Sequence, residues 1–343
     1  LVLYRSTESQ TPPGLDEWRA PLLKEVPMAK LASLALAHEG QSVRIMRRDH
    51  AWHIEDRFGY PADTAKLRRV MDTLRQATLL EAVPVEGALF DELELGDGQG
   101  ATLTLAQADG TPLFRLQAGA RHMKKPDGPE MAFYGGFPDG RYVRTDRGCF
   151  LLSDPLDFLE HDALQWLDKT FLQVSATELA SCAMDEPGQT AVRVRRGADG
   201  TGWELENVPP GRTQDVSRLS RVTDALAFFS FQDVADPALP DEITGLASGR
   251  VFTATATNGL AFTVRIGNPL SGGDSRYVKL GIAGPDPLPE SAAALQARLS
   301  PWIYQVADSQ TEAMRFTLDD LLVLESTTHT ATGAAAATAS SHP

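Results

Sequence analysis

The stretch at residues 43–83 sets the organisation of the chain, and the chain contains it twice. The first copy reads Val43-Arg44-Ile45-Met46-Arg47, then Trp52, then Tyr60-Pro61-Ala62-Asp63, then apolar residues at Leu67, Val70, Met71 and Leu74. The second copy reads Val192-Arg193-Val194-Arg195-Arg196, then Trp203, Pro210 and Asp215, then Leu219, Val222 and Leu226. Both copies predict a strand, a turn and an amphipathic helix that an aspartate can cap.

The similarity continues on both sides of this stretch at an offset of roughly 150 residues, which is the size of a domain. The further matching pairs, in the same order in both halves, are residues 31–36 with 179–184, 101–119 with 251–267, 141–143 with 276–278, and 150–154 with 304–308. We therefore expect two tandem copies of one domain. The alternative is a coincidence of common strand and helix patterning.

Each copy is predicted to contain strands, one amphipathic helix, more strands, and then short terminal helices. Asp109-Gly110 and Asn258-Gly259 predict the same hairpin turn in the two copies. The connections between strands are too short for parallel crossovers, so we expect an α+β fold with mostly antiparallel sheets. The expected divisions are a linker at 1–24, repeat domains at 25–170 and 171–326, and a disordered tail at 327–343.

The acidic composition restricts the classes of partner. The 343 residues include 46 acidic and 32 basic side chains, for a formal net charge of -14. A nucleic-acid binder is disfavoured because phosphate backbones attract Lys and Arg, and electrostatic docking on anionic lipid is disfavoured for the same reason.

Two cysteines, Cys149 and Cys182, are too few for a disulfide framework. Cys182 takes the position of an apolar residue in the first copy, which predicts a buried thiol. A disulfide between the two is an open alternative outside the cytoplasm.

The apolar residues Leu1 to Tyr4, followed by Arg5 and a polar, Pro-containing stretch, resemble the end of a membrane-spanning helix leading into a linker. We expect a membrane anchor there and a folded body outside the cytoplasm. The alternative is an arbitrary apolar start. No other run approaches the roughly 18 apolar residues that span a bilayer.

Glycine-rich loops do not predict a nucleotide site. Leu270-Ser271-Gly272-Gly273-Asp274 resembles an ATPase signature loop, but the sequence has no G-x-x-x-x-G-K-[ST] motif and a strand is expected next. The loop from Gly96 to Gly100 precedes a strand, whereas a dinucleotide fingerprint follows a strand and opens a helix.

Other polar clusters also lack the spacing of a reaction centre. The residues His50, His53, Glu55 and Asp56 surround Trp52 without a zinc motif, and His161-Asp162 has no partner nucleophile. The basic run from Arg121 to Lys125 is interpreted as an exposed hairpin loop. We therefore assign no catalytic, cofactor-binding or metal-binding residue.

Trp52 and Trp203 occupy the same position in the two copies. We interpret both as core anchors that are largely buried against the following helix. Stacking on a sugar is the alternative.

Together, Trp52, the run Tyr60-Pro61-Ala62-Asp63, Lys66-Leu67 and the run from Leu164 to Thr170 resemble the DUF4340 family. The resemblance implies an extracytoplasmic protein with one N-terminal transmembrane helix, often encoded beside auxiliary subunits of gliding-motility-type ABC transporters. It implies no catalytic residues. In the second copy Pro209-Pro210-Gly211 departs from the Tyr-Pro-Ala pattern.

We therefore expect a non-enzymatic binding or scaffold protein, tethered to the inner membrane, with its body in the periplasm. Its expected partner is a membrane complex, most simply an ABC-type transporter. No cofactor and no nucleic acid are expected. The alternative is an enzyme or ligand receptor that acts on envelope polymers through a cleft between the domains.

Overall fold

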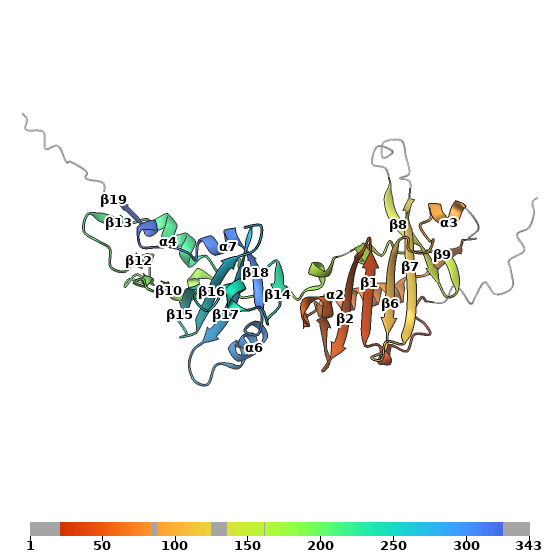
Figure 1. The fold of residues 1–343 in the computed structure, drawn as a ribbon, viewed down its shortest axis with the longest axis horizontal. Helices are drawn as coiled ribbons and strands as arrows, with labels where there is room; N and C mark the ends of the chain where they lie inside the picture. Colours follow the sequence, from red (N-terminus) through yellow and green to blue (C-terminus); the bar gives the residue numbers. More distant parts are fainter. Residues whose placement is uncertain (1–20, 84–87, 125–135, 161, 325–343) are drawn as a thin grey trace, which may run out of the picture. The chain divides into compact units, whose positions relative to one another are not determined.

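A computed structural model describes residues 21–83, 88–124, 136–160 and 162–324 of the chain (Figure 1). The chain divides into two compact units, Leu1–Thr170 with Gln232–Pro237, and Phe171–Phe231 with Ala238–Pro343. Both are rich in antiparallel sheet and carry few helices, so the expected α+β class is confirmed. The expected anchor at Leu1 to Tyr4 and the tail at 327–343 lie outside the described residues.

The first unit is built on one antiparallel sheet with the strand order β4-β3-β2-β1-β6-β7-β8-β9-β5. The strands are β1 (Ser33–His38), β2 (Gln41–Arg48), β3 (Ala51–Ile54), β4 (Tyr60–Pro61), β5 (Leu79–Ala82), β6 (Ala101–Ala106), β7 (Pro112–Lys124), β8 (Phe137–Thr145) and β9 (Gly148–Leu152). Leu103, Leu105 and Leu116 alternate with more exposed neighbours and are fully buried, as a sheet with one core face requires.

Helix α2 (Thr64–Gln76) of the first unit forms where the sequence predicts it. The carboxylate of Asp63 accepts the backbone N–H of Lys66, and Leu67, Val70 and Leu74 are buried. The shorter helices are η1 (Met28–Lys30), η2 (Glu55–Arg57), α3 (Ala88–Glu92), η4 (Asp157–Glu160) and η5 (Ala163–Trp166).

The second unit contains an antiparallel sheet in which the strands follow the order β12-β11-β10-β15-β16-β17-β18. These strands are β10 (Leu179–Asp185), β11 (Val192–Arg196), β12 (Trp203–Leu205), β15 (Arg250–Ala256), β16 (Ala261–Pro269), β17 (Ser275–Ala283) and β18 (Ile303–Ala307). A separate pair joins β13 (Arg212–Gln214) to β19 (Leu322–Leu324). The short strand β14 (Asp233–Ala235) lies in the segment that belongs to the first unit.

The helices of the second unit are η6 (Ala176–Glu178), α4 (Val216–Thr223), α5 (Asp241–Thr244), α6 (Glu290–Leu299), α7 (Asp308–Glu312) and η7 (Asp319–Leu321). Helix α4 ends at Thr223, so Leu226, which was expected on the helix, lies in the turn after it and is still fully buried. Helix α6 was not expected; it is weakly amphipathic and buries Ala292 and Leu299. Among the described residues no helix is long and apolar enough to cross a bilayer.

The two repeated tryptophans are not fully buried. Trp52 and Trp203 are each of intermediate burial, which agrees with the prediction of largely buried side chains but falls short of a fully enclosed core position. The reason is their place near sheet edges: β3 has only the two-residue β4 beyond it, and β12 is the outermost strand. The guanidinium of Arg196 lies 4.7 Å from the Trp203 ring centroid. Trp166 is instead the fully buried tryptophan of the first unit.

Candidate functional site

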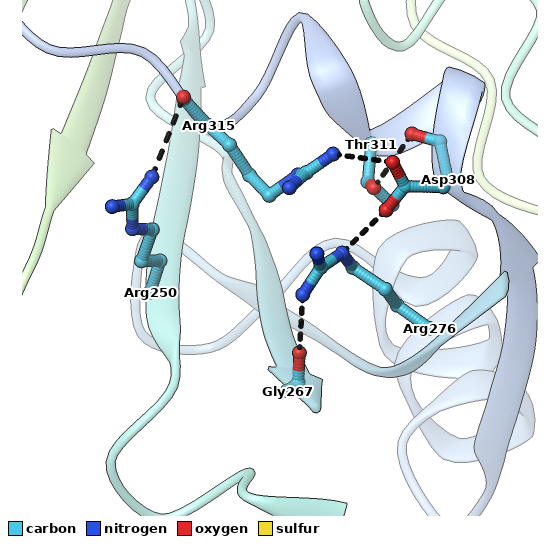
Figure 2. Close-up of polar contacts among 6 residues, drawn as sticks. All are labelled: Arg250, Gly267, Arg276, Asp308, Thr311 and Arg315. Carbon is cyan, nitrogen blue, oxygen red and sulfur yellow. Dashed lines mark hydrogen bonds and ion pairs between the residues drawn. The ribbon is translucent and has the colours of Figure 1, made fainter. Parts of the chain in front are cut away.

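A polar cavity of about 320 Å³ in the second unit is lined by three arginines, Arg250, Arg276 and Arg315. Arg250 opens β15, Arg276 is the second residue of β17, and Arg315 follows α7. Figure 2 shows that these side chains come from three separate elements, that Arg276 and Arg315 meet at one carboxylate, Asp308, and that Arg250 reaches the backbone carbonyl of Arg315.

Asp308 bridges two of the arginines. Arg276 Nε lies 2.5 Å from Oδ1 of Asp308, and Arg315 Nη2 lies 2.9 Å from Oδ2 (Figure 2). The backbone positions the carboxylate, because the N–H of Asp308 donates to the carbonyl of Asp274 and its own carbonyl accepts the hydroxyl of Thr311. Each oxygen therefore has its own guanidinium partner, which is a charge-assisted arrangement.

The bridge keeps Asp308 ionised. Burial acts to raise the pKa of Asp308, but the hydrogen bonds and positive charges of Arg276 and Arg315 outweigh it and hold the pKa below its usual value. The group is thus a fixed negative charge at neutral pH and orients the two guanidinium groups.

Arg250 lies on another side of the cavity and is about a third exposed. Its Nη2 is 3.1 Å from Oε1 of Glu186, and its Nη1 donates to the carbonyl of Arg315 at 3.4 Å (Figure 2). The three guanidinium groups therefore form ion pairs with two carboxylates, Asp308 and Glu186. The Nε of Arg315 is buried and has no hydrogen-bond partner among the described residues.

Two glycines beside the cavity stand where the neighbouring backbone leaves no room for a side chain. A Cβ at Gly267 would lie 2.0 Å from the carbonyl oxygen of Thr244, and a Cβ at Gly249 would lie 2.4 Å from that of Ile266. Both obstacles are backbone atoms that cannot rotate away. The carbonyl of Gly267 also accepts Nη1 of Arg276 at 3.3 Å, so the close approach of the backbone helps to place that arginine.

The first unit contains a related arginine with a different environment. Arg141 is 3% exposed, and it donates Nε to the carbonyl of Gly119 at 2.8 Å and Nη1 to the carbonyl of Pro155 at 3.2 Å. Strand β6 of the first unit starts with Ala101, which pairs with Ala118 on β7. Strand β15 of the second unit starts with Arg250, which pairs with Ile266 on β16. The first unit therefore has an alanine where the second has Arg250.

The histidine cluster of the sequence forms local contacts in the structure. His53 Nδ1 lies 2.8 Å from the carbonyl of Gly59, Glu55 pairs with Arg44 and Arg48, and Asp56 accepts the N–H of Arg44. The described part of the chain brings no three His, Cys, Asp or Glu side chains together in a way that could hold a metal ion.

The remaining candidates are dispersed. The loop from Leu270 to Asp274 is the turn between β16 and β17, and the loop from Gly96 to Gly100 precedes β6. Asp162 caps η5, whereas His161 lies outside the described residues. In the basic run, Arg121 pairs with Asp157 and His122 with Asp139, and Lys125 lies outside the described residues.

Sequence reasoning missed the arginine cavity. Arg276 belongs to the repeated Arg-Tyr-Val pattern, which indicates a repetition and no site. Arg250 and Arg315 lie 65 positions apart and have no motif around them. The sequence match of 101–119 with 251–267 sets Ala101 against Val251, so it gave no signal for Arg250; only the strand pairing places Arg250 where the first unit has Ala101.

The comparisons with known proteins give one match. The family model described as a domain of unknown function, DUF4340, covers residues 52–249. This chain belongs to the DUF4340 family. The resemblance carried by Trp52, Tyr60 to Asp63 and Leu164 to Thr170 is thereby confirmed. No curated protein and no solved structure matches the chain. The DUF4340 match ends at Gly249, immediately before Arg250, so the three cavity arginines lie beyond it.

Proposed function

We propose that the two units are tandem copies of one domain, because their helix starts make the same contacts. Asp63 caps α2 and Asp215 caps α4. The N–H of Asp63 donates to the carbonyl of Trp166, and the N–H of Asp215 donates to the carbonyl of Leu321, both at 2.9 Å. A basic side chain one turn into each helix reinforces this corner: Lys66 donates to the carbonyl of Gln165 and Arg218 to that of Asp320.

The strand order and the glycine contacts support the same proposal. The order β2-β1-β6-β7-β8 corresponds to β11-β10-β15-β16-β17. A Cβ at Gly119 would lie 2.0 Å from the carbonyl of Leu93, as a Cβ at Gly267 would from the carbonyl of Thr244. An experimental structure in which the two halves have different topologies would contradict the duplication.

We further propose that the protein is a non-enzymatic binding or scaffold protein, tethered to the inner membrane, with its body in the periplasm. Its proposed partner is an ABC-type transport or envelope complex. The family resemblance motivates the compartment and the partner. The acidic body supports a covalent tether, because a protein with a net charge of -14 has little attraction for an anionic leaflet.

The state of Asp308 is the observation that carries the non-enzymatic part of the proposal. A general base works best with a pKa near the operating pH. The pKa of Asp308 is lowered instead, and both of its oxygens are held by arginines. This arrangement suits recognition of a charged group and does not suit proton transfer.

Photo-crosslinking in native membranes tests the partner. A benzophenone amino acid can replace Phe228, which is 86% exposed in the second unit, or Phe137, which is 54% exposed in the first. Neither position carries a core contact, so the fold should tolerate both. We expect ultraviolet light to join the full-length protein to a transporter subunit from at least one position. Absence of any membrane-complex adduct from both positions would contradict the scaffold proposal.

Protease accessibility tests the compartment independently. In cells with a permeabilised outer layer, we expect added protease to digest the folded body of the uncut gene product. A body that stays protected until the inner membrane is lysed would contradict the periplasmic location.

A further inference from the structure

We propose that the arginine-lined cavity of the second unit is a binding site for a phosphate group, carried by a small molecule or by a lipid headgroup. In this site Arg250 and Arg315 donate to the phosphate oxygens, and Asp308 holds Arg276 and Arg315 in position. The inference does not rest on the tether or on the partner proposed above, and it can fail while they stand.

The charged lining of the cavity is the first argument. Among the residues that line it, the charged side chains are Arg250, Arg276 and Arg315, which stay charged at any physiological pH. Their carboxylate neighbours in the described part of the chain lie outside this lining: Asp308 and Glu186 form ion pairs with them, and the charge of Asp320 also acts on Arg250. A phosphate with its oxygens on several sides can contact more than one of these guanidinium groups.

The remaining hydrogen-bond donors are the second argument. A guanidinium has five N–H groups in a fixed fork. The Nε of Arg315 has no partner among the described residues, but it is buried from solvent, so a ligand oxygen reaches it only after a local movement. Arg250 is about a third exposed, so its N–H groups can be reached from solvent. A phosphate oxygen in the cavity would therefore accept first from Arg250.

The shape of the site is the third argument. The cavity measures about 320 Å³, which is larger than a bare ion needs and leaves room for the group that carries the phosphate. The glycines at positions 249 and 267 cannot be replaced by larger residues without a collision with backbone carbonyls. Close backbone packing therefore fixes this wall of the cavity and the carbonyl of Gly267 that holds Arg276.

The first unit also places an arginine at the corresponding corner. Arg141 is almost completely buried, and the backbone carbonyls of Gly119 and Pro155 accept two of its N–H donors. The start of β6 carries Ala101 where β15 carries Arg250. Both units thus carry one arginine at this place, and in the second unit Arg250 and Arg315 join it around a cavity.

A ligand titration of the full chain tests the proposal. Inorganic phosphate and glycerol phosphate are titrated separately by calorimetry or by NMR at constant ionic strength. The test variant is Arg250→Gln, which removes one guanidinium group from the lining of the cavity. The matched control is Arg195→Gln on β11, which removes an exposed arginine of the same unit that is paired with Glu204. Both variants change the net charge equally.

We expect saturable binding of at least one probe, about tenfold weaker in Arg250→Gln and within about twofold of the original in Arg195→Gln. Tighter binding of glycerol phosphate would indicate a headgroup, and tighter binding of inorganic phosphate would indicate the free anion. Lack of saturation by both probes would overturn the proposal, as would equal weakening in the two variants, because equal weakening reports general electrostatic attraction.

A second variant guards against a folding defect in the first. Arg250→Lys keeps the positive charge and loses the planar fork. Arg250→Lys should keep the melting temperature of the original protein and bind phosphate several-fold more weakly. Unchanged affinity in Arg250→Lys together with a misfolded Arg250→Gln would contradict the role assigned to the fork.

Discussion

Replacing Gly267 by alanine tests the backbone packing that shapes the cavity. The new Cβ would lie 2.0 Å from the carbonyl oxygen of Thr244, so β16 and the end of α5 must separate by about 1 Å before an ordinary contact is restored. Overpacking of this kind costs about 1–3 kcal/mol, and we expect the upper part of that range because the obstacle is backbone. The displacement also moves the carbonyl that accepts Arg276.

The measurement is urea denaturation of the full chain, with calorimetry to resolve the second unit. A loss of about 2–3 kcal/mol lowers the melting temperature of a domain of this size by about 2–4 °C for each kcal/mol. Gly281→Ala is the control, because its Cβ would meet the hydroxyl of Thr263 at 2.5 Å and a hydroxyl can rotate. A loss below about 0.5 kcal/mol for Gly267→Ala, or an equal loss in the control, would refute the reasoning.

Three further predictions concern other side chains. Trp166→Ala should cost about 3–5 kcal/mol of unfolding free energy because the ring is fully buried. Trp52→Ala should cost about 1–2 kcal/mol because its ring is only of intermediate burial. Denaturant titration measures both, and equal losses would contradict the prediction. Burial raises the pKa of the Cys182 thiol to about 12. In the folded protein at pH 8, a thiol reagent should therefore modify Cys149 slowly and leave Cys182 unmodified. Cys182 should react only after denaturant is added. The pKa of Asp308 is lowered in the folded protein, so the ionised carboxylate stabilises the fold above the unfolded pKa, and this contribution is lost as the pH falls through the folded pKa. Asp308→Asn should therefore cost more unfolding free energy at pH 7 than near pH 3. Equal costs at the two pH values would refute this prediction.

The two units share some contacts and differ in others. The helix corners of both units are closed by an aspartate cap and a basic side chain. Arg141 of the first unit is almost completely buried, whereas Arg276 of the second unit lines a cavity. In the proposed duplication, one copy keeps the structural arginine and the other adds Arg250 and Arg315 to it.

Much of the fold could be predicted from local sequence signals. The Asp109-Gly110 and Asn258-Gly259 turns join the expected strand pairs, and Asp63 caps the expected helix. These signals act over a few residues, since turn chemistry and capping depend on backbone dihedrals and nearby N–H groups. Helix α6 escaped prediction because its small residues give only a weak amphipathic pattern.

The degree of burial could not be predicted from the same signals. Trp52 and Trp203 share a strand position in the sequence, but the sheet places their strands at or near an edge, where one side remains open. Trp166 follows no repeated aromatic pattern and is fully buried. Burial depends on which elements meet, and that information is distributed over the whole chain.

The sequence by itself determined the α+β class, the hairpins, the capped helices and the DUF4340 family, because each depends on neighbouring residues or on a recurring sequence pattern. Only the tertiary structure decided the arginine cavity. Arg250, Arg276, Asp308 and Arg315 come from two strands, the start of a short helix and the loop after it, and no periodicity links them. A local pattern records which backbone conformation is favoured, whereas the meeting of charges from distant elements depends on strand pairing across the sheet.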